Sequence, residues 1–370
     1  MLKLPTDGED VGHTPLRVLV GGACLVLIIA GLRSASELLV PIAFSAFLAV
    51  LAMPLVSWLR RRRVPDVLAV GVVVLLVLAL LSGLAGVVGG SVNSLVAEMP
   101  RYQERFNGLV TMVTGYLEDH GIEVSASKVR GLLDLSSTIG LVGGTVAQLA
   151  SVLSDTFLVI LTVVFLLFES LVLPAKLRAA IGEASASVSR YGKIITEIHR
   201  YVVLKTYVSL AVGVLVWVML LLLGVDFALL WGLITFLLHF IPNIGAIVAG
   251  LPPVLLALIQ YGVGRAAVVM AGFTVISMVF GNIVEPRVMG RRLGLSTLVV
   301  FLSLLVWGWM WGGMGMLLSV PLTMILKIVL ENSQDWQWIA VLMDDAVPAE
   351  PTSRRSLTPR SSVLPSPPAE

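Results

Sequence analysis

A small set of polar residues interrupts the long apolar stretches of this sequence, and chemistry is expected at these residues. The set consists of Asp155, His239, Asn243, Asn282 and Glu285. An ionisable side chain inside an apolar stretch is costly to bury, so it usually faces a partner or a water-filled cavity. We therefore expect these residues to line a substrate or ion pathway.

Glu285 is the strongest candidate because Pro286 follows it directly. Proline removes a backbone donor and disfavours helical conformation at the preceding residue, so we expect the chain to open at Glu285. An opened turn exposes carbonyl oxygens beside a carboxylate, which suits a proton or a hard cation. The alternative is a structural ion pair between Glu285 and one of the arginines that follow it.

Other polar residues have structural interpretations beside the functional ones. His239 lies three residues before Pro242, where it could donate to a freed carbonyl or titrate near neutral pH. Asp155 could instead cap a helix. Glu169 and Asp226 lie near the ends of apolar runs, where a carboxylate at the membrane interface is ordinary.

Two apolar runs, residues 227–264 and 293–326, are too long to cross a membrane once. A spanning helix needs about 20 residues, and both runs contain residues that favour a turn. We expect hairpin and hinge positions at Pro242, Gly245, Gly250, Pro252, Pro253, Pro286, Gly312, Gly313, Gly315 and Pro321. Each run is predicted to be a re-entrant helical hairpin, although two complete short spans would satisfy the same topology. Broken backbone at membrane depth must be covered by protein or line a cavity, which favours a translocation site.

The composition indicates a membrane protein. Of the 370 residues, 57% are hydrophobic and 13% are charged, whereas soluble domains average roughly 45–50% and 25%. The mean hydropathy is +0.97, which favours an all-α polytopic protein with about six full spans plus the two hairpins. The net charge of +2 gives no reason to expect a nucleic-acid partner, and one cysteine gives no multi-cysteine metal site. The sequence has none of the common hydrolase, metalloprotease or phosphate-loop motifs, so we expect no enzyme activity and no bound cofactor.

Basic residues predict the orientation. The run Arg60-Arg61-Arg62-Arg63 follows the second predicted span and marks the cytoplasmic side. Counting spans and hairpins from there puts both termini in the cytoplasm. The expected location is the bacterial cytoplasmic (inner) membrane.

The chain divides into six expected parts. They are N-terminal scaffold spans at 1–97, an extracytoplasmic helical segment at 98–134, a fourth span at 135–170, a cytoplasmic amphipathic helix at 171–205, a transport core at 206–331 and a disordered Pro/Ser-rich tail at 346–370. In the core, each hairpin follows one span, and the two pairs enter from opposite sides. This order has the form of an inverted repeat, which the echo between residues 232–235 and 294–297 supports weakly.

Two motifs carry a family resemblance. Residues 240–245, continuing to Gly250-Leu251-Pro252-Pro253, form the first, and residues 282–290, followed by 293–296, form the second. Together they resemble the signature of the autoinducer-2 exporter family, also called PerM-like permeases, over nearly the whole chain except the tail. The resemblance implies multi-pass inner-membrane transport of a quorum signal, sodium–proton antiport in some members, and an oligomer with an elevator-like moving domain.

The combined expectation is a secondary transporter that exports a small polar organic molecule by alternating access. Glu285 would handle a coupling ion, H⁺ or Na⁺. The expected partners are the small-molecule or ion substrate, the lipid bilayer and further copies of the chain in a homo-oligomer. A monovalent cation/proton antiporter is one alternative, and a membrane scaffold that does not transport is another.

Overall fold

The computed structural model describes residues 14–120, 156–181, 186–242, 244–289, 294–331, 333 and 336–345. Asp155, Asn243, residues 121–134 and the Pro/Ser-rich tail lie outside the described residues. Within the described ranges every regular element is a helix, which confirms the all-α prediction.

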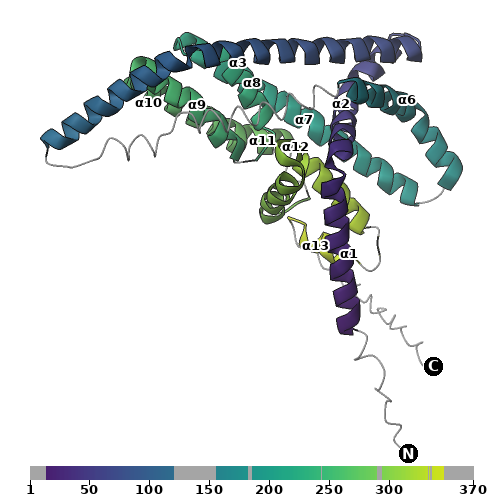
Figure 1. Ribbon diagram of the computed structural model, residues 1–370. Helices are drawn as coiled ribbons and strands as arrows, with labels where there is room; N and C mark the ends of the chain where they lie inside the picture. The colour runs from purple at the N-terminus through teal and green to yellow at the C-terminus, as the bar shows by residue number, and fades with distance from the viewer. Residues whose placement is uncertain are drawn as a thin grey trace, which may run out of the picture.

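Figure 1 shows the described helices in chain order from the N-terminus to the C-terminus. They are α1 (Thr14–Ser34), α2 (Ser36–Arg61), α3 (Asp66–Asp119), α6 (Thr156–Ile181), α7 (Ala186–Leu222), α8 (Ala228–Leu238), α9 (Ile244–Tyr261), α10 (Val263–Val279), the π-helix η1 (Phe280–Val284), α11 (Glu285–Met289), α12 (Thr297–Glu331) and α13 (Gln337–Leu342). Six of the described helices are long and apolar enough to span a membrane. The protein is therefore a multi-pass membrane protein, and two of those six helices, α9 and α12, belong to the predicted hairpin runs.

Three helices continue through expected domain boundaries, and α6 is one of them because it runs past residue 170 to Ile181. The long α3, which crosses the top of Figure 1, passes residue 97 without a break and carries the described part of the outer segment. Similarly, α7 joins the basic amphipathic stretch to the following span across residue 205. The described parts of these segments are therefore continuous with apolar helices.

Both predicted hairpin breaks are present. Hairpin 1 consists of α8 and α9, and the chain turns after α8 at residues 239–242. Hairpin 2 is α12 itself, which bends at Gly312, where φ is 63° and ψ is −145°. The Trp307 indole donates to Thr323 Oγ1 over 3.0 Å, which joins the two limbs of hairpin 2. The first limbs, α8 and residues 297–311, would reach only about 17 and 22 Å, short of the roughly 30 Å hydrocarbon core.

A glycine permits the tight closure of each hairpin. A Cβ atom on Gly245 would lie 1.8 Å from the Leu238 carbonyl oxygen, and one on Gly315 would lie 1.9 Å from the Trp307 carbonyl oxygen. These two predicted hinge glycines therefore occupy comparable positions. The echo between residues 232–235 and 294–297 does not, because the first stretch lies inside α8 and the second mostly precedes α12.

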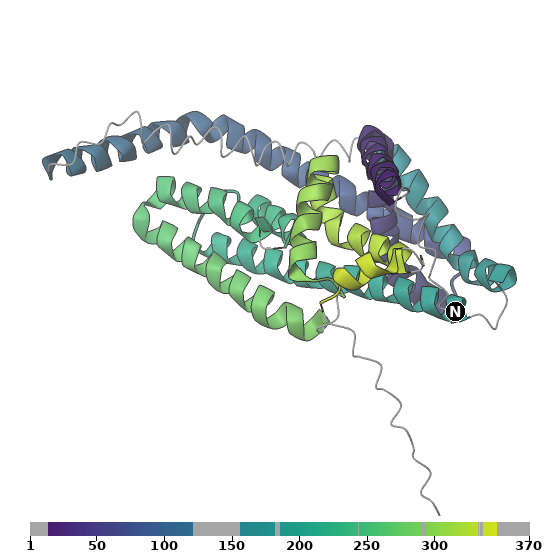
Figure 2. The same ribbon diagram turned by 90° about the horizontal axis from the view of Figure 1, so that it is seen from below.

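The two largest apolar clusters of the described residues involve different groups of helices. One joins α7, α8, α9 and α10 around Trp231 and Val216. The other joins α2, α3 and α6 to the bend of hairpin 2. Figure 2 shows α12, in yellow-green, lying between these two groups of helices.

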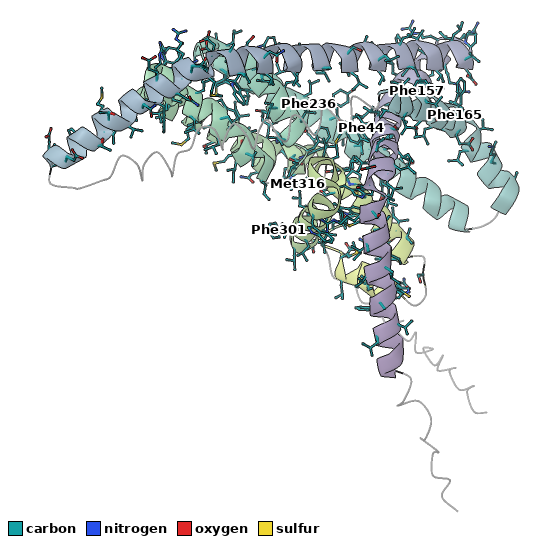
Figure 3. The ribbon with its side chains drawn as sticks, viewed as in Figure 1. Phe44, Phe157, Phe165, Phe236, Phe301 and Met316 are labelled. Carbon is teal, nitrogen blue, oxygen red and sulfur yellow. The ribbon has the colours of Figure 1, made fainter. Side chains whose placement is uncertain are left out.

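Many large apolar side chains lie on the outside, as lipid-facing side chains should. Phe157 and Phe165 on α6, and Phe301 on α12, are exposed and point away from the interior (Figure 3). Because a bilayer is as apolar as these side chains, their exposure is compatible with the membrane location.

Candidate functional site

A cavity of about 670 Å³ lies beside the tip of hairpin 1. Its walls come from α7, hairpin 1, the α10–η1–α11 run, α12 and the segment at residues 336–345, called here the C-terminal segment. The polar lining consists of Tyr201, Lys205, His239, Ser277, Asn282, Glu285, Thr297 and Asp345. The cavity therefore joins parts of the sequence that are far apart.

The lining contains an ion pair between buried Lys205 and partly buried Glu285. Lys205 Nζ donates to Glu285 Oε1 over 2.5 Å, joining α7 to α11. The Lys205 side chain is only 3% exposed, whereas the Glu285 side chain is 23% exposed and faces the cavity. A buried ammonium needs such a partner, because removing either charge would leave the other unpaired in an apolar environment.

The second carboxylate oxygen of Glu285 has a different neighbour. His239 Nε2 lies 4.0 Å from Glu285 Oε2, which is beyond hydrogen-bonding distance. The His239 side chain is 9% exposed, and its Nε2 has no hydrogen-bond partner among the described residues. An unpartnered buried nitrogen facing a carboxylate is uncommon in folded proteins and calls for an explanation.

The backbone before Glu285 widens into a π-helix. The Glu285 N–H donates to the carbonyl of Phe280, five residues earlier, and Glu285 keeps helical angles of φ −58° and ψ −49°. The expectation that the chain opens at Glu285 is therefore wrong, because the helix continues through Glu285 with one wider turn. The wider turn accommodates the ring of Pro286, and single π-turns of this kind occur often at functional sites.

The predicted site residues fall into three groups. His239, Pro242, Asn282, Glu285 and Pro286 line the cavity together. Asp155 and Asn243 lie outside the described residues. The remaining positions are Gly245, Gly250, Pro252, Pro253, Gly312, Gly313, Gly315 and Pro321, which lie in α9 and α12 but outside the cavity lining.

Several of these remaining positions have packing roles. A Cβ on Gly250 would lie 3.2 Å from the Phe273 ring, so this glycine brings α9 close to α10. Pro252 and Pro253 are buried inside α9 without ending it. Their location indicates helix packing rather than contact with a substrate.

Lys205 and Tyr201 line the cavity but were not among the expected site residues. In the sequence, Lys205 belongs to a basic cluster that the positive-inside rule explains by itself. The available signal was its position at the boundary of the charge-free stretch 206–225, one helical turn after Tyr201.

The C-terminal segment closes one side of the cavity. Asp345 contributes to the lining, and the Met343 carbonyl accepts the Ser296 N–H over 2.8 Å. Lys327 holds this arrangement through Asp344, 3.1 Å away, and through the Gly294 carbonyl.

The carboxylates near the helix ends have structural partners. Asp226 accepts a hydrogen bond from Tyr102 over 2.7 Å and another from Gln260. These contacts form an outer clasp that joins α3 to the loop before α8 and to the end of α9. Glu169 pairs with Lys176 over 2.9 Å at an exposed site. Neither carboxylate reaches the cavity, which agrees with the structural interpretation.

Comparisons with known proteins agree with this architecture. The family model described as AI-2E family transporter matches residues 23–335. The chain is 40% identical over 330 residues to "AI-2 transport protein TqsA" of Escherichia coli (strain K12), covering 89% of this chain and 96% of that protein. It is also 37% identical over 341 residues to "Putative transport protein YhhT" of the same organism, covering 92% and 97%. The chain therefore belongs to the AI-2E transporter family.

Proposed function

We propose that the protein is a secondary transporter of the bacterial inner membrane that exports a small polar organic molecule. The cargo is of the autoinducer-2 type, a proposal that rests on the name of TqsA, 40% identical to this chain. Transport proceeds by alternating access with an elevator-like movement in a homo-oligomer, and Glu285 couples it to a proton or cation.

The cavity beside the broken hairpin is the observation that carries this proposal. Its volume of about 670 Å³ lies within the range of small-molecule sites. Transporters commonly build their substrate sites from interrupted helices near the middle of the membrane. A scaffold protein has no comparable reason to keep a buried Lys205–Glu285 pair beside a cavity.

Alternating access requires parts that can separate, and two contacts are suited to this role. Phe240 at the tip of hairpin 1 packs on Leu317 and Leu318 of hairpin 2. The C-terminal segment contacts α12 on another side of the cavity. We propose that these two closures open in turn, and that basic residues orient the C-terminal closure and both termini toward the cytoplasm.

Proteoliposomes that contain labelled cargo and an internal pH dye test the function. We expect wild-type protein to release the cargo with accompanying ion movement, and Glu285→Gln to lose most of this coupled release. Glu169→Gln is the matched control, because its exposed pair with Lys176 lies away from the cavity. Equal coupled release by wild-type protein and Glu285→Gln would contradict the coupling role.

A cation/proton antiporter is the second candidate. Pro286 has no N–H, so the carbonyls of Gly281 and Asn282 lose that donor beside the Glu285 carboxylate, and both residues line the cavity. Sodium, lithium or potassium gradients applied without cargo would move protons if this candidate holds. A dye that responds only when cargo is present would support the organic exporter.

Water access separates both transport candidates from a scaffold. We expect an Asn282→Cys variant in a Cys24→Ser background to react with water-soluble thiol reagents, and cargo to slow that reaction. A cysteine at residue 282 that never reacts would remove the cavity from any transport route.

A further inference from the structure

The two oxygens of Glu285 face partners of different chemistry. Oε1 accepts from Lys205 at 2.5 Å, while Oε2 faces the unpartnered Nε2 of His239 at 4.0 Å. Oε1 is thus already paired with a cation, whereas Oε2 can still take a proton or bind an ion. This asymmetry constrains which ion the site can take.

Lys205 disfavours a metal cation at Glu285. An alkali or alkaline-earth cation binding to this carboxylate would lie within a few ångströms of a fixed ammonium in a site of low dielectric constant, where like charges repel strongly. Such hard cations also prefer a shell of oxygen ligands. The nearest unoccupied group on the Oε2 side is instead an imidazole nitrogen.

His239 suits a proton. A neutral imidazole has one bare nitrogen that accepts a hydrogen bond, and a protonated carboxyl group has one O–H to donate. Shortening the distance from 4.0 Å by roughly 1 Å would bring Oε2 and Nε2 into hydrogen-bonding range. His239 lies just after α8 at the tip of hairpin 1, so movement of that tip would change this distance.

We propose that the coupling ion is a proton held on Glu285 Oε2 and shared with His239 Nε2, while Lys205 is the fixed counter-cation that excludes metal ions. The proton arrives from water and converts the carboxylate to a carboxyl group whose O–H donates to Nε2, while Oε1 still accepts the hydrogen bond from Lys205. The proton then returns to water on the opposite side, which restores the ionised pair between Glu285 and Lys205. The inference rests on the proposed function and names its coupling ion.

The described lining has two titratable groups besides Lys205, His239 and Glu285. Tyr201 comes from α7, beside Lys205, and Asp345 comes from the C-terminal segment. Asp345 is exposed, and the ionic partners of Glu285 among the described residues are Lys205 and His239. The lining therefore offers Glu285 and His239 as the pair whose separation depends on hairpin 1.

The experiment counts protons moved per cargo molecule in proteoliposomes with an internal pH dye and labelled cargo, in media with or without sodium, lithium and potassium. We expect wild-type protein to move protons with cargo in the absence of all three metal ions. We expect His239→Gln to lower the protons per cargo molecule at least tenfold. His120→Gln is the matched control, because His120 is exposed just after the end of α3, and this variant should leave the ratio unchanged.

The positioning role of Lys205 is tested by measuring the ion selectivity of transport in Lys205 variants. We expect Lys205→Met to gain a sodium or lithium response, with the half-maximal cation concentration at least about tenfold below any wild-type response, because close buried charge pairs are worth at least that factor. Lys205→Arg should keep the proton selectivity. The double variant Lys205→Met/Glu285→Gln leaves neither charge unpaired, so normal thermal unfolding of this variant would separate loss of coupling from loss of fold.

Two results would overturn the inference. One is wild-type transport that a sodium, lithium or potassium gradient drives at constant pH. The other is an unchanged proton-to-cargo ratio in a folded His239→Gln protein. If Glu285→Gln still impairs transport in either case, the proposed function stands and only the proton assignment fails.

Discussion

The two hairpins have the same kind of backbone break in different surroundings. The tip of hairpin 1 brings His239 and Pro242 to the cavity. The bend of hairpin 2 buries Met310, Trp311 and Met314 in the cluster formed with α2, α3 and α6. The tip of hairpin 1 therefore contributes a polar side chain to the cavity, and the bend of hairpin 2 packs against the N-terminal helices.

The hairpins are also held at opposite ends. Asp226, just before α8, is fixed by the outer clasp to α3, so hairpin 1 is held at its base. The Trp311 indole donates to the Leu32 carbonyl of α1 over 3.1 Å, so hairpin 2 is held at its bend. In this protein, the break that lies beside the cavity is therefore the one that polar residues accompany.

The largest predicted loss of stability concerns the tight glycine closure that the two hairpins share. Gly245→Ala and Gly315→Ala would each place a Cβ within 1.9 Å of a backbone carbonyl oxygen. We expect both to destabilise the fold by more than about 4 kcal/mol, beyond ordinary overpacking, because backbone atoms must move. Thermal unfolding in detergent measures this loss. Gly264→Ala is the control, because no atom lies within 4 Å of its added Cβ.

The second prediction distinguishes the structural role of the hairpin 2 bend from the transport role of the hairpin 1 tip. Trp311→Phe removes the bond to the Leu32 carbonyl and part of a buried ring, so we expect a loss of about 2 kcal/mol of unfolding free energy. The proton-to-cargo ratio should not change. His239→Gln should show the reverse pattern, and similar profiles for the two variants would remove the distinction between the hairpins.

A smaller effect concerns the base of hairpin 1. Tyr102→Phe removes the hydrogen bond to the Asp226 carboxylate, and bonds to charged groups contribute about 1.5–3 kcal/mol. We expect a loss near the lower value, measured by thermal unfolding. No measurable loss would indicate that the clasp does not hold hairpin 1.

The smallest effect concerns the limbs of hairpin 2. Thr323→Val removes the acceptor of the Trp307 indole, so we expect a loss of about 1 kcal/mol. Thermal unfolding compared with Trp311→Phe provides the measurement. A loss as large as that of Trp311→Phe would mean that the limbs contribute as much as the buried bend.

Local residue patterns predicted most of the fold. Proline and glycine restrict backbone conformation wherever they occur, so the breaks near Pro242 and Gly312 were predictable. The wider helical turn before Pro286 was not, because a π-turn and an opened turn satisfy the same local restriction. Asn282, Glu285 and His239 were expected in one pathway, and the structure brings all three to one cavity.

Hydropathy and backbone restrictions act within short stretches of chain, so the sequence was enough to predict the membrane class, the helical elements, the two breaks and the polar residues near them. The pairing of Lys205 with Glu285, which lies 80 residues later, depends instead on the tertiary structure. The tertiary structure also decided that the bend of hairpin 2 is buried away from the cavity. Both outcomes depend on how α7 and α12 pack against distant helices, which no local pattern specifies.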